Sequence, residues 1–378
     1  MDFTFTEEQH QFQDSLQRFV RKDYDFERRR AIIASDAGWS REVWQQLAEM
    51  GVMALALPEA YDGFGGGGFD TLLVMEALGR GMVVEPYLAT VVLGAGVLID
   101  AGSAAQRQAV LPAVAAGERL LALAHDEPGQ RYASSTIATT AQAVDGGYRI
   151  DGQKSVVLHG AEADQLIVSA RTAGDVRDAQ GISLFLVDAT APGVERFGYP
   201  TQDGLRAASI RFNNVRVGAD ALIGTEHEAL AVIEKALDRG IAALCAEAVG
   251  NMTATIEATV GYLKTRKQFG VPIGTFQALQ HRAVDMYLHA EQARSMAYLA
   301  AAKLEAPSGE RRQAVSAAKV LVSQSAHFVG QQAVQLHGGI GVTDELAVSH
   351  YFKRLTMISM LFGDADFHLD RFGQHLAA

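Results

Sequence analysis

Cysteine and tryptophan are the scarcest residues of this chain, with one cysteine and two tryptophans in 378 residues. The lone Cys245 excludes an internal disulfide and any metal site built from several cysteines. Long hydrophobic runs are also missing, and none approaches the roughly 20 apolar residues of a membrane-spanning helix. The opening MDFTFTEEQH lacks the basic and apolar regions of a secretion signal. We therefore expect a cytoplasmic protein with no membrane partner.

Basic residues are outnumbered, with 33 Lys and Arg against 44 Asp and Glu and a formal net charge of −11. Nucleic-acid binding requires a basic surface, so we expect no nucleic-acid partner. A small anionic ligand is still compatible with this charge, because a local basic pocket can exist on an acidic protein.

The length and the local patterns predict three domains, because 378 residues are too many for one compact core. Residues 1–118 have helical patterns, 119–225 have the short runs of a β domain, and 226–378 return to long helical patterns. The predicted fold class is α+β: a helical N-terminal domain, a middle antiparallel β domain and a C-terminal four-helix bundle. We see no internal repeat.

In the first region, apolar residues recur at helical spacing: Phe5, Phe12, Leu16 and Phe19. Thr6 with Gln9 predicts a capping box, and Ser40 predicts the start of a further helix over 40–50. The glycine cluster in LPEAYDGFGGGGFD has no Gly-Lys-Ser/Thr after it, so we expect a loop between helices and no phosphate loop.

In the middle region, Asp145-Gly146 and Asp151-Gly152 predict hairpin turns on either side of YRI. Helices between the β-type runs are not evident, which disfavours a doubly wound nucleotide-binding fold. The last region predicts helices over 226–264, 277–304, 311–337 and 345–371.

Three segments contain residue types that suit ligand binding. In YLKTRKQFGVPIGTFQ, Arg266 can fork onto a phosphate and Phe269 can stack on a planar ring. The glycines of QLHGGIG at 335–341 allow a ligand to approach the backbone closely. The third segment is DEP at 126–128. A fourth stretch, LFGDADFHL at 361–369, is by itself compatible with a metal site, an acid–base pair or neither.

Together with TEEQ, LPEAYDGFG, YRIDGQKSVV and the NNV near residue 214, these segments resemble the acyl-CoA dehydrogenase family over essentially the whole chain. The resemblance implies the same three-domain order. It also implies FAD in a cleft between the β domain and the bundle, partly contacted by a neighbouring subunit. An acyl-CoA substrate, a tetramer and an electron-transfer partner follow from it as well.

The resemblance also assigns site residues. It implies that Arg266, Gln268 and Phe269 bind the FAD of the adjacent subunit, with Gln277 in the same region. Gln335, Gly338 and Gly339 match the segment at the adenine and pyrophosphate. Ala124 to Glu127, and Val156, Val157 and Leu158, match the two stretches beside the isoalloxazine. Asp238 matches an aspartate that contacts CoA. No metal site is expected.

The catalytic base of the family is missing from its usual places. Counting from QLHGGIG, the glutamate position falls on Phe362, and the flavin-contacting threonine position falls on Asp364. The alternative glutamate position of a family subset falls on Gly240. Glu247 shares a helix face with Gly240 and is the candidate base, and the alternative is a structural carboxylate bonded to a neighbouring backbone group or an Arg.

Two further stretches depart from the family. Gly129–Tyr132 replaces the usual Gly-Ala-Gly-Ser, and Val156–Leu158 replaces Trp-Ile-Thr. The chain is thus expected to be an acyl-CoA dehydrogenase, or a base-deficient subunit of a heteromeric one that acts on bulky substrates such as steroid side chains. The alternatives are a scaffold without dehydrogenase chemistry, or a flavin monooxygenase or oxidase on the same fold. His368 is expected on a helix surface or against a neighbour.

Overall fold

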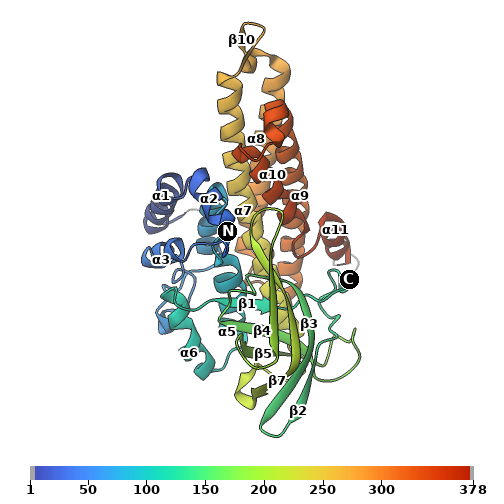
Figure 1. Ribbon diagram of the computed structural model, residues 1–378. Helices are drawn as coiled ribbons and strands as arrows, with labels where there is room; N and C mark the ends of the chain where they lie inside the picture. The colour runs from blue at the N-terminus through green and yellow to red at the C-terminus, as the bar shows by residue number, and fades with distance from the viewer. Residues whose placement is uncertain (1–4, 375–378) are drawn as a thin grey trace. The chain divides into compact units, whose positions relative to one another are not determined.

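A computed structural model describes residues 5–374 (Figure 1). Its contacts divide the chain into two compact units. The bundle unit contains the chain up to Ala34, residues 68–83 and the chain from Ile241 onward. The sheet unit contains residues 35–67 and 84–240. Helices of the first 118 residues are therefore shared between the two units, whereas the sequence predicted one separate helical domain. The predicted domain boundaries stay a prediction.

The bundle unit begins with α1 (Glu7–Lys22), where the predicted capping box between Thr6 and Gln9 is confirmed. α2 (Phe26–Ala34) was not predicted, and α4 is Gly68–Gly81. α1 packs on α4, and its buried face is made of Leu16, Phe19 and Val20.

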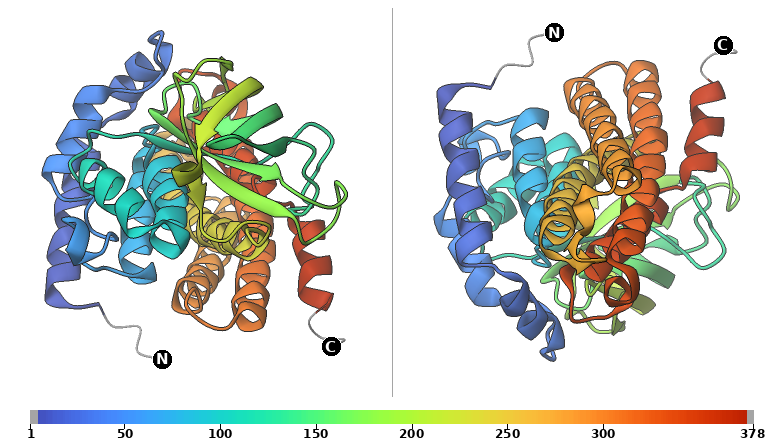
Figure 2. Two further views of the ribbon diagram at one scale, coloured as in Figure 1. Left: turned by 90° about the horizontal axis from the view of Figure 1, so that it is seen from below. Right: turned by 90° about the horizontal axis from the view of Figure 1, so that it is seen from above.

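The long helices are α7 (Leu230–Thr265), α8 (Gln277–Ala302) and α9 (Ser308–His337), near their predicted bounds. The predicted helix over 345–371 is wrong as one element, because it is broken into α10 (Ala347–Met360) and α11 (Ala365–Gln374). α9 packs against α8, α10 and α11, and α8 and α9 run side by side (Figure 2). A short hairpin, β9 (Lys267–Gln268) and β10 (Val271–Pro272), precedes α8.

The sheet unit contains α3 (Arg41–Glu49), and Ser40 caps it as predicted. The helical segments η2 (Leu88–Ala95), α5 (Gly96–Ala101) and α6 (Ala104–Ala115) follow later in the chain. Backbone hydrogen bonds fix the start of the glycine loop, including Gly65 N–H to Leu57 O at 2.8 Å and Gly66 N–H to Leu55 O at 2.8 Å. The loop is thus held by its own backbone.

The sheet has the order β6-β7-β3-β2-β4-β5-β8, with β1 paired to β4. Its strands are β1 (Leu121–Ala124), β2 (Thr140–Val144), β3 (Gly147–Leu158), β4 (Gln165–Arg171), β5 (Ile182–Asp188), β6 (Val194–Pro200), β7 (Arg206–Gly218) and β8 (Leu222–Ile223). The prediction of a wholly antiparallel sheet is wrong at two places, since β1 and β2 both pair with β4 in parallel.

Of the two predicted turns, the one at Asp145-Gly146 is confirmed, because it joins β2 to β3. The turn at Asp151-Gly152 is wrong, because both residues lie inside β3 at a register shift against β7. Gly152 has φ +150°, and a Cβ there would lie 2.6 Å from Thr139 Cα. The glycine therefore marks a β-bulge.

The hydrophobic core of the sheet unit is formed by buried side chains of several strands, including Ala124, Ile150, Val157, Phe185 and Ile210. Within residues 5–374, no helix is long and apolar enough to cross a membrane.

Candidate functional site

Backbone strain coincides with the segments that the sequence singled out. Side chains other than glycine rarely adopt positive φ, and a β-branched or bulky residue there is an outlier. Of nine such residues in the part of the chain that the structure describes, four fall in or beside the predicted site segments: Arg131 (φ 55°), Val156 (52°), Phe269 (53°) and Phe362 (57°). Strain of this kind gathers at functional sites, so these positions point to one.

In the sheet unit, the DEP segment is fixed by a buried lysine. The Lys154 ammonium is fully buried and donates to Glu127 Oε1 at 2.7 Å, Ser169 Oγ at 3.0 Å and His125 O at 3.2 Å. Burial is the main cause that lowers the pKa of Lys154 to about 8, and Glu127 opposes this shift. The segment after Ala124 is therefore anchored to β3 by an ion pair.

Glu127 and His125 complete this network. The Glu127 carboxylate also accepts the Ala138 N–H at 2.7 Å and the Thr139 N–H at 3.0 Å. His125 Nδ1 lies 3.0 Å from Ser169 Oγ, and burial lowers the pKa of His125 to about 3, so the ring is neutral at pH 7. Every one of these groups has a polar partner, as buried polar groups require.

The second predicted stretch, Val156–Leu158, contains another bulge. Lys154 pairs with Ile210 and Val157 with Ala208, so Ser155 and Val156 together face one residue of β7. Val157 is buried, whereas Val156 is 41% exposed. The Ser155 N–H donates to Asp126 O at 2.8 Å and joins the bulge to the DEP segment. The structure therefore brings the two predicted stretches together.

In the bundle unit, the hairpin after α7 presents its residues to solvent. Phe269 is 92% exposed between β9 and β10, and Arg266 and Gln268 are exposed beside it. Gln277 is the exposed first residue of α8. Val271 is 39% exposed and Phe276 38% exposed, and the Phe269 and Phe276 ring centroids are 6.2 Å apart, so the hairpin presents a contiguous apolar patch of the kind that marks interaction sites.

The QLHGGIG segment spans the last residues of α9 and the start of the short helix η5 (Gly338–Val342). His337 stacks on Tyr262 of α7 with ring centroids 4.5 Å apart, and its Nδ1 lies 2.8 Å from Ala333 O. Gln335 is exposed, and a Cβ built at Gly338 or Gly339 would meet no atom within 4 Å. The stacked rings thus hold two predicted cofactor segments together and leave open space over the glycines.

Glu247 has a definite partner. Its Oε1 accepts a hydrogen bond from Arg354 Nε at 2.5 Å and its Oε2 accepts one from Arg354 Nη2 at 2.6 Å, and both side chains are buried. The geometry is the bidentate pairing that guanidinium and carboxylate favour. It supports the ion-pair alternative that the sequence left open for Glu247.

The break between α10 and α11 surrounds Phe362. Lys319 of α9 is fully buried and donates to Ile358 O and, at 2.8 Å, to Leu361 O. His368 Nε2 lies 3.0 Å from Phe362 O, and its Nδ1 lies 3.3 Å from Ser316 Oγ. His368 is fully buried, so the expectation of a helix-surface position is wrong and that of a neighbour contact is right.

Burial lowers the pKa of His368 to about 3, so the ring is neutral and can donate through one nitrogen only. Asp364 caps α11, because its Oδ1 accepts the Phe367 N–H at 2.9 Å. Asp366 is exposed. No three His, Cys, Asp or Glu side chains gather to hold a metal ion in the described part of the chain.

Asp238 is fully buried on the part of α7 that belongs to the sheet unit. The next residue, Arg239, donates to Gly96 O at 3.1 Å and pairs with Asp100. Asp100 also accepts Lys235 at 3.0 Å, so two cations fix this turn of α7 against α5.

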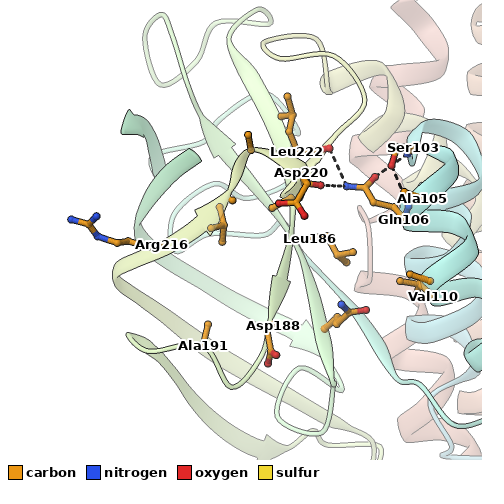
Figure 3. Close-up of a pocket in the computed structure, with 16 residues that line it drawn as sticks. Ser103, Ala105, Gln106, Val110, Leu186, Asp188, Ala191, Arg216, Asp220 and Leu222 are labelled. Atoms are coloured by element: carbon orange, nitrogen blue, oxygen red, sulfur yellow. Dashed lines mark hydrogen bonds between the residues drawn. The ribbon is translucent and has the colours of Figure 1, made fainter. Parts of the chain in front are cut away.

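An open cavity of about 730 Å³ lies elsewhere in the sheet unit, lined by α6, β5 and the segment before β8. Gln106 spans its rim and donates to Asp220 O at 2.8 Å and Leu222 O at 3.0 Å (Figure 3). None of its lining residues belongs to a predicted site segment.

Sequence reasoning missed Lys154, Lys319 and Arg354. Lys154 lies in the quoted YRIDGQKSVV string, so the motif contained a signal for it. Lys319 and Arg354 stand in ordinary amphipathic helices, and their partners lie dozens of residues away.

Family models cover nearly the whole chain. The acyl-CoA dehydrogenase N-terminal domain matches residues 6–118, the middle domain 122–215 and the C-terminal domain 230–377. Among solved structures, the Tcur3481-Tcur3483 steroid ACAD G363A variant is 31% identical, with 98% of each chain covered and a TM-score of 0.88.

The ChsE4-ChsE5 complex from Mycobacterium tuberculosis is 29% identical with a TM-score of 0.89, covering 100% of this chain and 99% of that chain. The FAD complex of PigA is 27% identical with a TM-score of 0.91 and the same coverage. The chain therefore belongs to the acyl-CoA dehydrogenase family.

Proposed function

We propose that this chain is the base-deficient subunit of a heteromeric, FAD-dependent acyl-CoA dehydrogenase acting on a bulky, steroid-type acyl-CoA in the cytoplasm. The reaction removes a proton from the α carbon of the thioester and a hydride from the β carbon. When bound, FAD would supply the hydride acceptor of this reaction, and a separate electron-transfer protein would reoxidise it. A carboxylate would accept the proton.

The observation that carries this proposal is the ordered turn at Phe362. By the count from QLHGGIG this residue takes the glutamate position, and a phenyl ring cannot accept a proton. Gly240 takes the other known position, and the Glu247 carboxylate is held by Arg354. A paralogous partner subunit would supply the base, which agrees with the two-chain names of the steroid ACAD and ChsE4-ChsE5 relatives.

The residues of this chain fit FAD in three respects. Arg266 and Gln268 are exposed hydrogen-bond donors beside the exposed Phe269 ring. The open faces of Gly338 and Gly339 allow close approach of a phosphate or an adenine. In the sheet unit, the strained bulge at Val156 is joined to the DEP segment. In the proposal, Arg266 and Gln335 complete a partner's FAD site and Asp238 contacts the CoA portion.

Co-expression with a neighbouring homologue tests the assembly. We expect a heterotetramer that retains FAD and reduces it when a steroid-type acyl-CoA is added, while the chain purified alone does neither. A homotetramer of this chain that binds stoichiometric FAD and bleaches with an acyl-CoA would overturn the subunit proposal. A heteromer without flavin absorbance would favour a scaffold, and rapid oxygen consumption by the reduced flavin would favour an oxidase or monooxygenase.

Two sets of variants test the residue roles. Arg266→Ala should release FAD from the heteromer, whereas Lys264→Ala, also exposed on the last turn of α7, should retain it. The double variant Glu247→Leu/Arg354→Met removes the ion pair without leaving a buried charge. Turnover of the assembled enzyme should persist in it. Loss of turnover with FAD still bound would restore Glu247 as the base.

A further inference from the structure

A buried arginine of α2 is connected to the start of α10 by polar contacts. Arg29 is fully buried, its Nε donates to Met82 O at 2.8 Å, and its Nη1 lies 3.2 Å from His350 Nδ1. His350, in the first turn of α10, is buried as well, and its Nε2 lies 3.0 Å from Asp344 O. All four residues belong to the bundle unit. A chain of polar contacts therefore runs from α2 through one imidazole ring to the segment between η5 and α10.

The direction of each hydrogen bond in this chain follows from the chemistry of its two ends. A guanidinium has donors only and stays protonated, so His350 Nδ1 accepts from Arg29. A backbone carbonyl is an acceptor only, so His350 Nε2 carries the proton and donates to Asp344 O. The neutral ring in this one tautomer satisfies both ends. A doubly protonated ring would place its Nδ1–H against the N–H of Arg29 and lose that hydrogen bond.

The surroundings of His350 favour the same neutral ring. Burial is the main cause that lowers its pKa, and the cations of Arg29 on α2 and Lys353 on α10 lower it further. The Asp344 carbonyl and carboxylate oppose the shift. That carboxylate lies 3.9 Å from His350 Nε2 and already accepts Lys353 Nζ at 2.6 Å. The Phe26 ring of α2 packs edge to face with the imidazole, with ring centroids 4.9 Å apart.

Asp344 lies two residues after η5, in the segment that η5 joins to α9. The Thr343 N–H and Oγ1 both donate to Ile340 O, at 3.2 Å and 2.9 Å, so the end of η5 and the residue before Asp344 form one hydrogen-bonded turn. The other end of η5 begins with Gly338 and Gly339, which have open space above them. A displacement of Asp344 would therefore be transmitted through this turn to the two glycines.

We propose that Arg29 and His350 are positioning residues for the QLHGGIG segment, and that the neutral His350 ring holds η5, through Asp344 O, in the conformation that receives FAD. The inference rests on the proposed function, because it requires the cofactor at Gly338 and Gly339. Neither Arg29 nor His350 touches the cofactor in it. Protonation of His350 would bring a second cation to hydrogen-bond distance of Arg29, and like charges repel, so the ring would turn away and Asp344 O would lose its donor.

The sign of the pH dependence follows from this arrangement. FAD that binds the neutral form lowers the pKa of His350 further, so binding releases a proton where the free protein is protonated. The dissociation constant should be constant above the pKa of the free protein and rise by up to about tenfold per pH unit below it. Arg29→Met removes a cation that lowers this pKa, so the loss of affinity should begin at higher pH than in wild type.

The experiment titrates the apo-heteromer with FAD between about pH 5 and pH 8 at constant ionic strength, followed by flavin fluorescence. Denaturant unfolding at each pH confirms that the protein is folded. His350→Gln keeps one acceptor and one donor group and cannot be protonated, whereas His350→Phe keeps a ring with neither. Arg29→Lys keeps the cation that Arg29→Met removes. The control is His327→Gln, because His327 is an exposed histidine of α9 in the same unit.

Wild type, Arg29→Lys and His327→Gln should lose FAD affinity at the same acidic pH, and Arg29→Met at higher pH. His350→Gln should have a flat pH profile, and His350→Phe should bind FAD weakly throughout. A second measurement, hydrogen–deuterium exchange without FAD at one pH, should show faster exchange of residues 338–346 in Arg29→Met and His350→Phe than in wild type.

Unchanged FAD affinity in His350→Phe, an acid loss in His350→Gln as steep as in wild type, or unchanged exchange of residues 338–346 overturns this inference and leaves the proposed function standing. Absence of FAD binding in every protein, wild type included, overturns the proposed function, and the inference falls with it.

Discussion

Two buried lysines, one in each unit, balance their charge in different ways. Lys154 and Lys319 are both fully buried, and burial lowers the pKa of each to about 8. Lys154 donates to the Glu127 carboxylate at 2.7 Å. Lys319 instead donates to the carbonyls of Ile358 and Leu361, and none of the described carboxylates lies within hydrogen-bond distance of it.

The difference explains what each lysine stabilises. The last carbonyls of a helix have no intrahelical partner and carry partial negative charge, so a cation near them is favourable. Lys319 occupies that position at the end of α10 and, with His368, holds the turn at Phe362. Lys154 forms an ion pair that anchors the DEP segment to the sheet. One lysine thus orders a helix end and the other orders a strand end, both in segments of the proposed site.

Lys154→Met should have the largest effect on stability. It leaves the Glu127 carboxylate buried without its cation, and breaking a buried pair in this way costs about 3–5 kcal/mol. Denaturant unfolding measures it. Lys154→Met/Glu127→Gln should recover part of the loss, because the glutamine is neutral and its one carbonyl oxygen still accepts one of the two amides of Ala138 and Thr139. Equal stability of the single and double variants would mean that the ion pair does not determine the cost.

Lys319→Met should cost less, about 1–3 kcal/mol, because it removes hydrogen bonds to carbonyls and leaves no unpaired carboxylate. Lys303→Met is the matched control. Lys303 forms a surface pair with Glu310 at 2.8 Å, and its loss should cost no more than about 1 kcal/mol. A loss as large as that of Lys154→Met would erase the distinction between the two lysines.

The pH dependence should be common to both lysines. Each native pKa is about 8 against 10.5 for the model side chain, so between these values the unfolded chain binds more protons than the native one. The free energy of unfolding therefore gains up to about 1.4 kcal/mol per pH unit from each lysine as the pH rises through this window. Each Lys→Met variant should flatten the slope relative to wild type. If only one variant did so, the two sites would differ in solvation as well as in partner.

Local chemistry predicted many elements from the sequence. The capping box of α1, the Ser40 cap and the Asp145-Gly146 hairpin depend on residues that are adjacent in the chain, and all three are confirmed. Asp151-Gly152 has the same composition as a turn, and only its pairing with β7 makes it a bulge. β1, with the sequence LALA, has no polar alternation and was missed for that reason.

The candidate site was less predictable, because its geometry depends on contacts between distant residues. The sequence around Glu247 does not predict its pairing with Arg354, which lies 107 positions away. The helical pattern over 345–371 is continuous, and the break depends on Lys319 and His368. Positive φ at Val156 and Phe362 contradicts the ordinary preference of both residue types, so local propensity could not predict it. The motifs located the segments, and the tertiary contacts determined their conformation.

Asp364 provides the smallest expected effect and separates two roles at the helix break. As the cap of α11 it accepts the Phe367 N–H at 2.9 Å, so Asp364→Ala should cost about 1 kcal/mol, as is usual for an N-cap. Asp364→Asn keeps a capping oxygen and should cost only a few tenths of a kcal/mol. The family position also predicts a flavin contact for Asp364. If its charge serves that contact, Asp364→Asn will change FAD affinity at constant stability. If capping is its whole contribution, FAD affinity will fall only as far as stability falls in both variants. The break between α10 and α11 would then influence FAD binding only through the backbone conformation that Lys319 and His368 stabilise.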